Sequence, residues 1–383
     1  MAEGFITRRG TPTPPIPPVT LGVEWDQDTD TLTRLEDAVG LTAGSDFDGF
    51  NHYKLRRCMV NDDLSINYYI DPTDPTKIGE VVNTGTYTTG GTANYTGSHG
   101  QVMVEIPKFW WKTDEPTSDQ YQWRISDAAQ SGFSVHPAFI TGATTKDFIY
   151  MSAFEGNGNP LRSVSGVQPE ASQTIGTFRS RAQARGTGWQ LQTYWGTHAL
   201  QVLYSVEYAN FDSQTTIGQG IVNKASGSGN NSENTGATIS LGNTSGAASG
   251  TDGLVSISYR GVENFWGNIL KWVDGINIRN REAFVANENF ASDTFTGSYT
   301  SVGNLATSNG FVSDIQFPHF LATAVSGSST SHLHDSYSQN TGDRIARFGG
   351  AWPSGDSAGA FLWSLSLDSS RALRTVGSRL QIL

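Results

Sequence analysis

The sequence predicts an α+β protein in which a β-rich N-terminal region precedes a larger domain with two helices and long loops. The chain contains 43 Gly, and only 16% of its residues are charged. Gly, Ser, Thr and Asn weaken helix interiors and favour tight turns, so loops and short strands should dominate. The two best helical candidates both lie beyond residue 170. An all-helical fold is therefore not expected.

Composition also limits the function. With 383 residues, 37% of them hydrophobic, and ten Trp, the chain can fill two or three domain cores. Its net charge of −11 argues against sequence-independent nucleic-acid binding, which needs clustered Lys and Arg to displace counterions from phosphates. We therefore expect no nucleic acid as partner. We also expect no membrane as partner, because no apolar run reaches the ~18 residues of a membrane helix.

Cys58 is the only cysteine, which excludes an internal disulfide and a thiolate zinc cluster. Neighbouring arginines would lower the pKa of this thiol if they pointed at it, but a lone cysteine followed by Met59 and Val60 is more typical of a core. The N-terminus has no apolar core long enough for a secretory signal. We therefore expect synthesis in a cytoplasm, and release by lysis or within a particle.

The first 120 residues divide into an arm and a β-rich region. Residues 1–20 contain the run TPTPPIPP, whose prolines favour an extended arm that tethers or docks. Residues 21–120 begin with two short strands around an Asp-rich turn, anchored by Trp25, Leu32 and Leu35. Residues 66–79 and 100–114 predict further strands, separated by a Gly- and Thr-rich excursion.

Residues 121–383 should form the main domain. Helices are predicted over 172–185 and 193–209, and in the second one Leu200, Leu203 and Tyr204 lie on one apolar stripe. Residues 223–253 have almost no apolar content and predict a polar surface insertion. Further polar stretches cover 292–309 and 326–342. Long loops on one compact scaffold are how many proteins present a binding surface.

Most residues that could bind a metal or act in catalysis lack the further residues that such a site needs. The spacing of Asp26, Asp28 and Asp30 resembles the start of a calcium loop without its Gly and distal Glu, so a solvated turn is expected. His332 and His334 next to Asp335 offer metal ligands on one loop, but no second cluster completes a tetrahedral set. We predict no metal, no cofactor and no catalytic residue. Four isolated acids, Glu263, Asp274, Glu282 and Asp335, cannot be placed in one cleft from sequence.

The most specific motif is YRGVENFWGNILKWVDG, residues 259–275. Gly267 and Gly275 allow backbone that other residues resist, Asn264 and Asn268 can bond to loop backbone, and Trp272 fills a core. This motif resembles the GNxxEW signature of the C-type-lectin fold of formylglycine-generating enzyme and its relatives, with Lys in place of the acidic residue before Trp. The resemblance covers most of 126–383. The enzyme branch uses C-terminal active-site cysteines that this chain lacks, so the resemblance implies the fold without the reaction.

Within that fold, the C-terminal segment resembles phage and prophage tail receptor-binding proteins, including variable proteins diversified by retroelements. The resemblance implies a framework in the region 341–383, made of Gly349, Gly350, Trp352, Gly355, Gly359, Phe361, Trp363, Gly377, Arg379 and Leu380. It also implies that ligands contact the residues between them, namely Ala351, Pro353, Ser354, Asp356, Ser357, Leu362, Ser364, Ser366, Leu367, Asp368, Arg371, Ala372, Leu373, Arg374 and Thr375.

Composition supports this interpretation independently. Residues 341–380 contain no Lys, Glu, Gln or Met. Randomising the two adenines of an AAC codon gives Ala, Pro, Ser, Asp, Leu, Arg and Thr, but none of those four absent types. The alternative is an ordinary Ser- and Gly-rich closing hairpin.

The resemblance implies a tail-tip adhesin of the virion, made in the host cytoplasm. Residues 1–20 and 21–120 would attach to other tail or baseplate proteins, and 121–383 would bind a bacterial surface protein or glycan. Related adhesins are homotrimers, which lets weak contacts add up. Two alternatives remain: a structural baseplate component that does not bind the host, and an enzyme acting on surface polysaccharide.

Overall fold

A computed structural model describes residues 18–383, so most of the expected docking arm, 1–17, lies outside the described residues. The protein is mostly β-sheet, with 35% of residues in strands and 12% in helices. This confirms the β-rich character of the predicted α+β fold. Among residues 18–383, no helix combines the length and apolar character needed to cross a bilayer.

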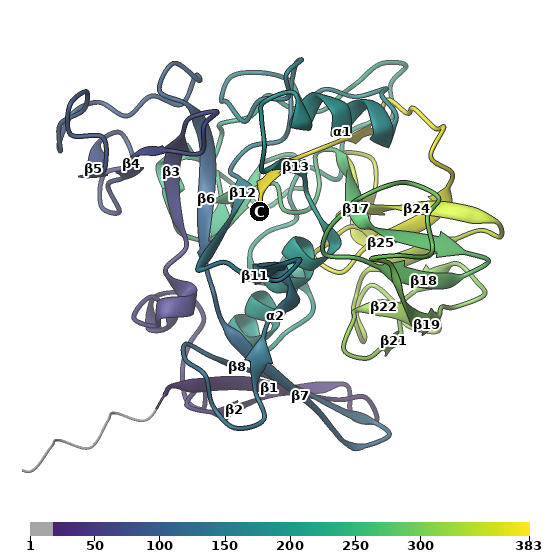
Figure 1. Ribbon diagram of the computed structural model, residues 1–383. Helices are drawn as coiled ribbons and strands as arrows, with labels where there is room; N and C mark the ends of the chain where they lie inside the picture. The colour runs from purple at the N-terminus through teal and green to yellow at the C-terminus, as the bar shows by residue number, and fades with distance from the viewer. Residues whose placement is uncertain (1–17) are drawn as a thin grey trace, which may run out of the picture.

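A five-stranded antiparallel sheet forms one end of the molecule (Figure 1). The expected strands around the Asp-rich turn are present as a hairpin, in which Trp25 pairs with Leu32. In the order β2-β1-β8-β7-β9, the strands are β2 (Thr31–Glu36), β1 (Thr20–Asp26), β8 (Gln120–Ser126), β7 (Trp110–Thr117) and β9 (Ser134–Val135).

A seven-stranded sheet joins distant parts of the chain. Its order is β13 (Trp189–Leu191), β27 (Leu380–Ile382), β12 (Phe148–Ser152), β6 (Gln101–Pro107), β3 (Arg56–Val60), β4 (Ile66–Ile70) and β5 (Ile78–Val81). Strand β6 pairs with β12, and β1 pairs with β8, so both pairings cross the boundary expected near residue 120. Residues 21–120 and 121–383 therefore share two sheets and do not form separate layers.

A third sheet carries the C-terminal segment. Its strands are β19 (Thr300–Asn304), β18 (Glu282–Val285), β17 (Leu270–Arg279), β24 (Asp343–Phe348), β25 (Trp363–Leu367), β23 (Ser336–Gln339) and β20 (Gly310–Phe311), and β26 (Val376–Gly377) pairs with β17 off this path. Short ladders complete the fold: β10 (Ile140–Thr141) with β11 (Thr144–Thr145), β14 (Gly246–Ala247) with β15 (Ile257–Tyr259) and β16 (Val262–Glu263), and β21 (Asp314–Gln316) with β22 (Leu321–Ala324).

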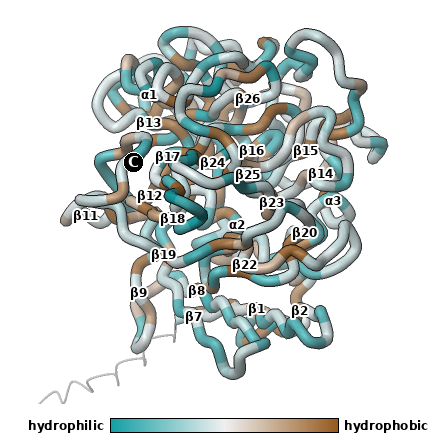
Figure 2. The backbone as a smooth tube through the Cα atoms, turned by 90° about the vertical axis from the view of Figure 1, so that its right-hand side faces the viewer, coloured by the Kyte–Doolittle hydropathy of each residue, from teal (hydrophilic) through white to brown (hydrophobic). Residues whose placement is uncertain are grey.

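Both predicted helices are present. Helix α1 (Ile175–Gln183) begins after Thr174, whose side chain accepts from the Thr177 N–H. Helix α2 (Tyr194–Tyr208) begins after Thr193, and a further one-turn helix, α3 (Ser213–Thr216), follows it. Figures 1 and 2 both show α2 between the five-stranded sheet and the end of the molecule that carries α1.

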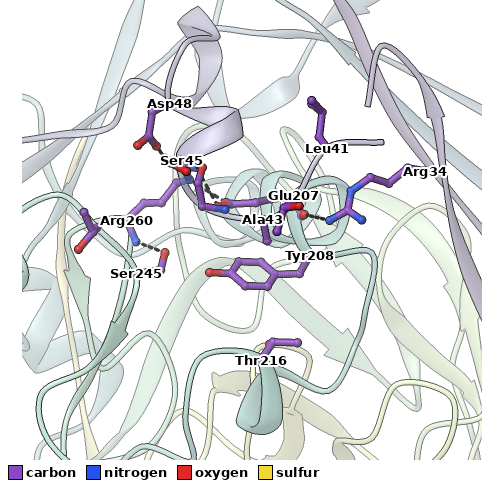
Figure 3. A pocket seen from close by; sticks show the side chains of 13 residues that line it. Arg34, Leu41, Ala43, Ser45, Asp48, Glu207, Tyr208, Thr216, Ser245 and Arg260 are labelled. Carbon is purple, nitrogen blue, oxygen red and sulfur yellow. Dashed lines mark hydrogen bonds and ion pairs between the residues drawn. The ribbon is translucent and has the colours of Figure 1, made fainter. Parts of the chain in front are cut away.

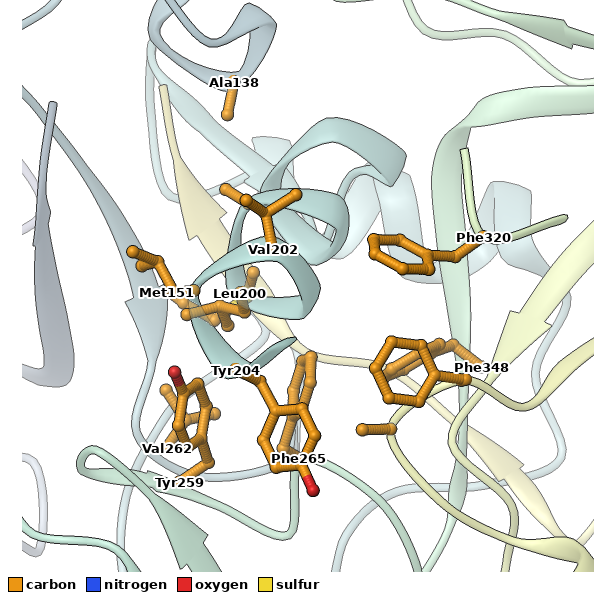
Figure 4. Packing of buried hydrophobic residues seen from close by; sticks show 14 of the residues in the cluster. Ala138, Met151, Leu200, Val202, Tyr204, Tyr259, Val262, Phe265, Phe320 and Phe348 are labelled. Atoms are coloured by element: carbon orange, nitrogen blue, oxygen red, sulfur yellow. The ribbon is translucent and has the colours of Figure 1, made fainter. Parts of the chain in front are cut away.

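Helix α2 is buried almost all round and does not expose the polar face that an apolar stripe implies. Leu200 and Tyr204 pack among residues of β12, β15, β16 and β24, as Figure 4 shows. Its polar side chains find partners inside the protein: Gln201 donates to the Ala360 carbonyl over 2.8 Å. The helix is therefore the centre of the core, around which the sheets are arranged.

The polar segment 223–253 has little regular structure, as expected, but it is not simply a surface insertion. Thr238 is fully buried, and its N–H and hydroxyl each donate to the Glu263 carboxylate over 2.7 Å. Arg57 donates to the Thr238 carbonyl over 3.1 Å. Side-chain hydrogen bonds thus replace the apolar anchors that the sequence lacks.

Candidate functional site

The expected framework is rigid and buried. Nine of its ten residues are buried, and Gly355 is half-buried. Gly349 and Gly350 have φ of +88° and +82°, a conformation that favours glycine. A Cβ on Gly377 would lie 2.6 Å from the Glu170 carbonyl oxygen. Arg379, fully buried, donates to the carbonyls of Ser152 and Asn264 over 2.7 and 3.1 Å, which fixes the C-terminal segment to the motif 259–275.

The motif runs from the end of β15 through β16 into β17, and its residues 264–269 form an irregular, hydrogen-bonded loop. Asn264 and Asn268 have φ of +49° and +57°, and the Asn268 side chain accepts from the Glu233 N–H over 2.7 Å. The Lys271 ammonium lies 3.0 Å from the Glu155 carboxylate, and both residues are fully buried. Burial lowers the pKa of Lys271 to about 8, although the nearby Glu155 charge opposes that shift. The predicted roles of Gly, Asn and Trp in this motif are confirmed.

The expected contact residues divide into three groups by exposure. Pro353, Asp356, Arg371 and Ala372 are exposed. Eight are half-buried: Ser354, Ser357, Ser366, Leu367, Asp368, Leu373, Arg374 and Thr375. Ala351, Leu362 and Ser364 are buried, at 0%, 6% and 8% exposure, so these three pack within the protein.

Two loops carry the exposed residues, and we call their surface the C-terminal loop face: loop 353–357 and loop 368–375. The two loops are close to each other. The guanidinium of Arg374, in the second loop, lies 5.9 Å from the centre of the ring of Trp352, which directly precedes the first loop. Arg374 also donates to the Gly229 carbonyl over 2.9 Å, and Ser369 lies 2.5 Å from the Asp293 carboxylate. The polar stretches 223–253 and 292–309 therefore border the same face.

Within loop 368–375, Asp368 organises the backbone. Its carboxylate accepts from the Ser370 hydroxyl and from the Ser370 N–H, the latter over 3.0 Å. The Ser370 hydroxyl lowers the pKa of Asp368 below its ordinary value. Leu373 packs against the buried cluster that contains Trp272. This loop is thus held at both ends while Arg371 and Ala372 face solvent.

Loop 353–357 borders a pocket of about 480 Å³ that includes Asp356, Asp212 and His334. Its wall also contains Asp335, whose carboxylate accepts from the Phe361 N–H over 2.6 Å, and burial raises its pKa well above the ordinary value. The pocket connects the C-terminal loop face to the third polar stretch, 326–342.

The residues considered for metal binding are separated. His332 faces Asp30, with 3.4 Å between ring nitrogen and carboxylate, while His334 faces Asp212 at 3.6 Å. Asp26 caps its own turn through Thr29. Within residues 18–383, no group of three or more His, Cys, Asp and Glu is arranged to hold a metal ion.

The four isolated acids also have separate partners. Glu263 accepts from Gly236 and Thr238, and Asp335 from Phe361. Asp274 accepts from Arg179 over 2.6 Å, and Glu282 lies 2.5 Å from the Ser301 hydroxyl. Cys58 is fully buried in β3, and burial raises its thiol pKa, as a core position would.

Two larger hollows lie away from the C-terminal loop face. Figure 3 shows one of about 640 Å³, where Arg260 donates to the buried Glu207 carboxylate over 2.7 and 2.8 Å. The other, of about 990 Å³, lies at the end of the seven-stranded sheet. Its Glu105 accepts from Arg56 and Tyr69 over 2.9 and 2.6 Å. In both hollows the buried charges already have partners.

Sequence reasoning missed Arg347 on β24. Its side chain is 7% exposed and donates to the hydroxyls of Ser364 and Ser366, two of the expected contact residues. The available signal was a single Arg inside the otherwise apolar end of a strand, IARF, directly before the two framework glycines. An arginine at such a position needs a reason, because charged residues are seldom buried without a partner.

Comparison with protein-family models finds no family that matches the chain, and comparison with curated proteins finds no match either.

Proposed function

We propose that this protein is a phage or prophage tail-tip adhesin that binds a receptor on the bacterial surface through the C-terminal loop face. The observation that carries the proposal is the contrast between a buried Gly and Trp framework and the two loops it holds, whose Pro353, Asp356, Arg371 and Ala372 are exposed. A loop whose backbone is already held in place loses little backbone entropy on binding.

The motif 259–275 and the segment 348–380 support a C-type-lectin-like domain as the carrier of this face. The framework residues of both segments are buried, except for the half-buried Gly355, and Arg379 joins the two segments by donating to the carbonyls of Glu263 and Asn264. Residues 1–20 and the β-rich region would attach the protein to other tail or baseplate proteins. We expect a homotrimer, since several weak sites on one particle reinforce each other. Sedimentation equilibrium of the purified protein measures the subunit number.

Binding of the purified protein to a panel of bacterial strains tests the adhesin. We expect strain-selective binding that the double variant D356A/R371A loses, because both side chains are exposed on the C-terminal loop face. The matched control is D28A/K54A, which also removes one acid and one base at exposed positions, but in the first 60 residues.

Equal melting temperatures would show that both variants are folded. Equal binding by D356A/R371A and the wild-type protein would place the receptor site elsewhere. Absence of binding to every strain would instead favour the structural baseplate role.

A further inference from the structure

Arg347 lies in a row of side chains that crosses the third sheet. Strand pairing places Trp272 of β17 opposite Arg347 of β24, Arg347 opposite Ser364 of β25, and Ser364 opposite Ser338 of β23. Arg347 and Ser364 are buried, whereas Ser338 and the nearby Ser366 are half-buried. The row therefore runs from the core to the surface of the molecule beside the expected contact residues.

The guanidinium of Arg347 has few partners for a buried charge. One terminal nitrogen, Nη2, donates to Ser364 Oγ over 2.5 Å and to Ser366 Oγ over 2.9 Å, and the group lies 6.0 Å from the Trp272 ring. Its Nε is enclosed and makes no hydrogen bond within residues 18–383. Burial lowers the pKa of Arg347 to about 10, and no carboxylate within residues 18–383 offsets the effect of this burial. The group still carries its charge at neutral pH.

Two other buried arginines show what a structural role looks like in this protein. Arg57 donates to the carbonyls of Gly261 and Thr238 and to the Thr238 hydroxyl. Arg379 donates to four backbone carbonyls. Arg379, like Arg347, has an enclosed Nε without a hydrogen-bond partner within residues 18–383, but its terminal nitrogens all donate to carbonyl oxygens, which are strong acceptors. Within residues 18–383, the side chain of Arg347 donates only to two serine hydroxyls, each of which keeps its own proton to donate.

This position therefore offers several hydrogen-bond donors, the Arg347 guanidinium and the two serine hydroxyls, but no strong acceptor for them. A buried cation is costly unless it is paired, and the arginine fork suits planar or tetrahedral oxyanions. We propose that Arg347 anchors the ligand beside the C-terminal loop face, at the end of β25 that leads into loop 368–375, and that the ligand carries an oxyanion, a carboxylate or a phosphate. This inference rests on the proposed function, and it makes an acidic surface glycan or other oxyanion-bearing polymer the receptor class.

In this arrangement the ligand oxyanion accepts from Arg347 and from the hydroxyls of Ser364 and Ser366. The half-buried Ser338 and Ser366 mark where the ligand would enter. Because Ser338 Oγ and Ser364 Oγ lie 2.5 Å apart, one hydroxyl can point at the other in the free protein and at the ligand in the complex.

A first experiment compares the stability of R347M with that of R57M. Replacing an unpaired buried charge by an apolar side chain of similar length should leave the melting temperature unchanged or raise it. R57M should melt at a lower temperature, because it leaves buried carbonyls without donors. A loss of stability in R347M comparable to that in R57M would assign Arg347 a purely structural role and overturn the proposal.

A second experiment measures binding of two small probes by titration calorimetry. Glucuronate supplies a carboxylate, glycerol 3-phosphate supplies a phosphate, and glucose is the neutral control at matched ionic strength. We expect the wild-type protein to bind at least one acidic probe and not glucose. R347M should weaken that binding at least tenfold, and R347K should restore part of it. R279M, which removes a half-exposed arginine paired with Asp343, should bind as the wild type does.

The outcomes separate this inference from the adhesin proposal. If the wild-type protein binds cells selectively but neither acidic probe, or if R347M binds cells and probes unchanged, the oxyanion site is wrong and the adhesin stands. If the acidic probes bind through Arg347 but no strain is bound, the oxyanion site stands and the adhesin is wrong.

Discussion

At the scale of single residues, His52 makes the stability of the protein depend on pH. The side chain is fully buried, and neither ring nitrogen has a hydrogen-bond partner within residues 18–383. Burial, assisted by the nearby Arg260 charge, lowers the pKa of His52 to about 3. In the unfolded chain the same group titrates near pH 6.5. The unfolded state therefore binds the proton first as pH falls.

We predict that H52F reduces the loss of stability on acidification. Between pH 6.5 and pH 5 the wild-type histidine stays neutral in the folded state and becomes charged in the unfolded state, which costs about 2 kcal/mol of unfolding free energy. Phenylalanine keeps an aromatic ring packed against Phe50 and cannot take up a proton, so this loss of unfolding free energy disappears. Urea unfolding of both proteins at the two pH values measures it. Equal losses in wild type and variant would show that His52 titrates normally in the fold.

Single residues are also where sequence reasoning was least complete. Pro353, Asp356, Arg371 and Ala372, four of the fifteen positions implied by the family resemblance, are exposed. Leu362 and Ser364 are buried together with their neighbours Trp363 and Leu365, so both sides of the chain at the start of β25 are covered, which no local pattern indicates. His52 and Arg347 owe their character to neighbours that are distant in the sequence, such as Arg260 and Ser364.

At the scale of elements, the turn between β24 and β25 depends on a glycine for steric reasons. A Cβ on Gly359 would lie 2.1 Å from Asp335 Oδ1, and the other oxygen of that carboxylate accepts from the Phe361 N–H. Asp335 is 2% exposed, so it has little room to move. This contact positions loop 353–357 relative to the stretch 326–342.

We predict that G359A lowers the free energy of unfolding by about 1–3 kcal/mol, the usual cost of forcing an extra group into a packed site. The matched control is G49A, since no atom lies within 4 Å of a Cβ at Gly49. Its stability should be unchanged or slightly higher, because alanine restricts the unfolded chain. Chemical denaturation of both variants measures the difference. If G359A were as stable as G49A, the Asp335 contact would not constrain the turn.

Local elements followed from the sequence better than their arrangement did. Both helices and the first hairpin formed where spacing and turn residues predicted them, because these signals act over a few residues. The burial of α2 almost all round could not be predicted from the sequence, since it depends on β1, β8 and β17, which pack around the helix. The fixed path of 223–253 depends on Glu263 and Arg57, which are remote in sequence.

At the scale of the whole molecule, strand pairing joins residues 20–120 to the rest of the described chain. Strand β12 lies between β6 and β27, so one sheet contains residues near 60, 150 and 380. Strand β1 takes its second neighbour, β8, from beyond the expected boundary. A fragment ending near residue 120 would lose these neighbours and expose the unpaired backbone groups of β1 and β6.

We therefore predict that residues 18–383 unfold in one cooperative transition, with equal calorimetric and van't Hoff enthalpies in differential scanning calorimetry. A fragment of residues 21–120 should give the poorly dispersed amide spectrum of an unfolded chain. Two separate transitions, or a folded fragment, would contradict this and support an independent attachment domain. If the prediction holds, the C-terminal loop face and the region proposed to attach to the particle belong to one folding unit, so a substitution in one that unfolds it removes the other as well.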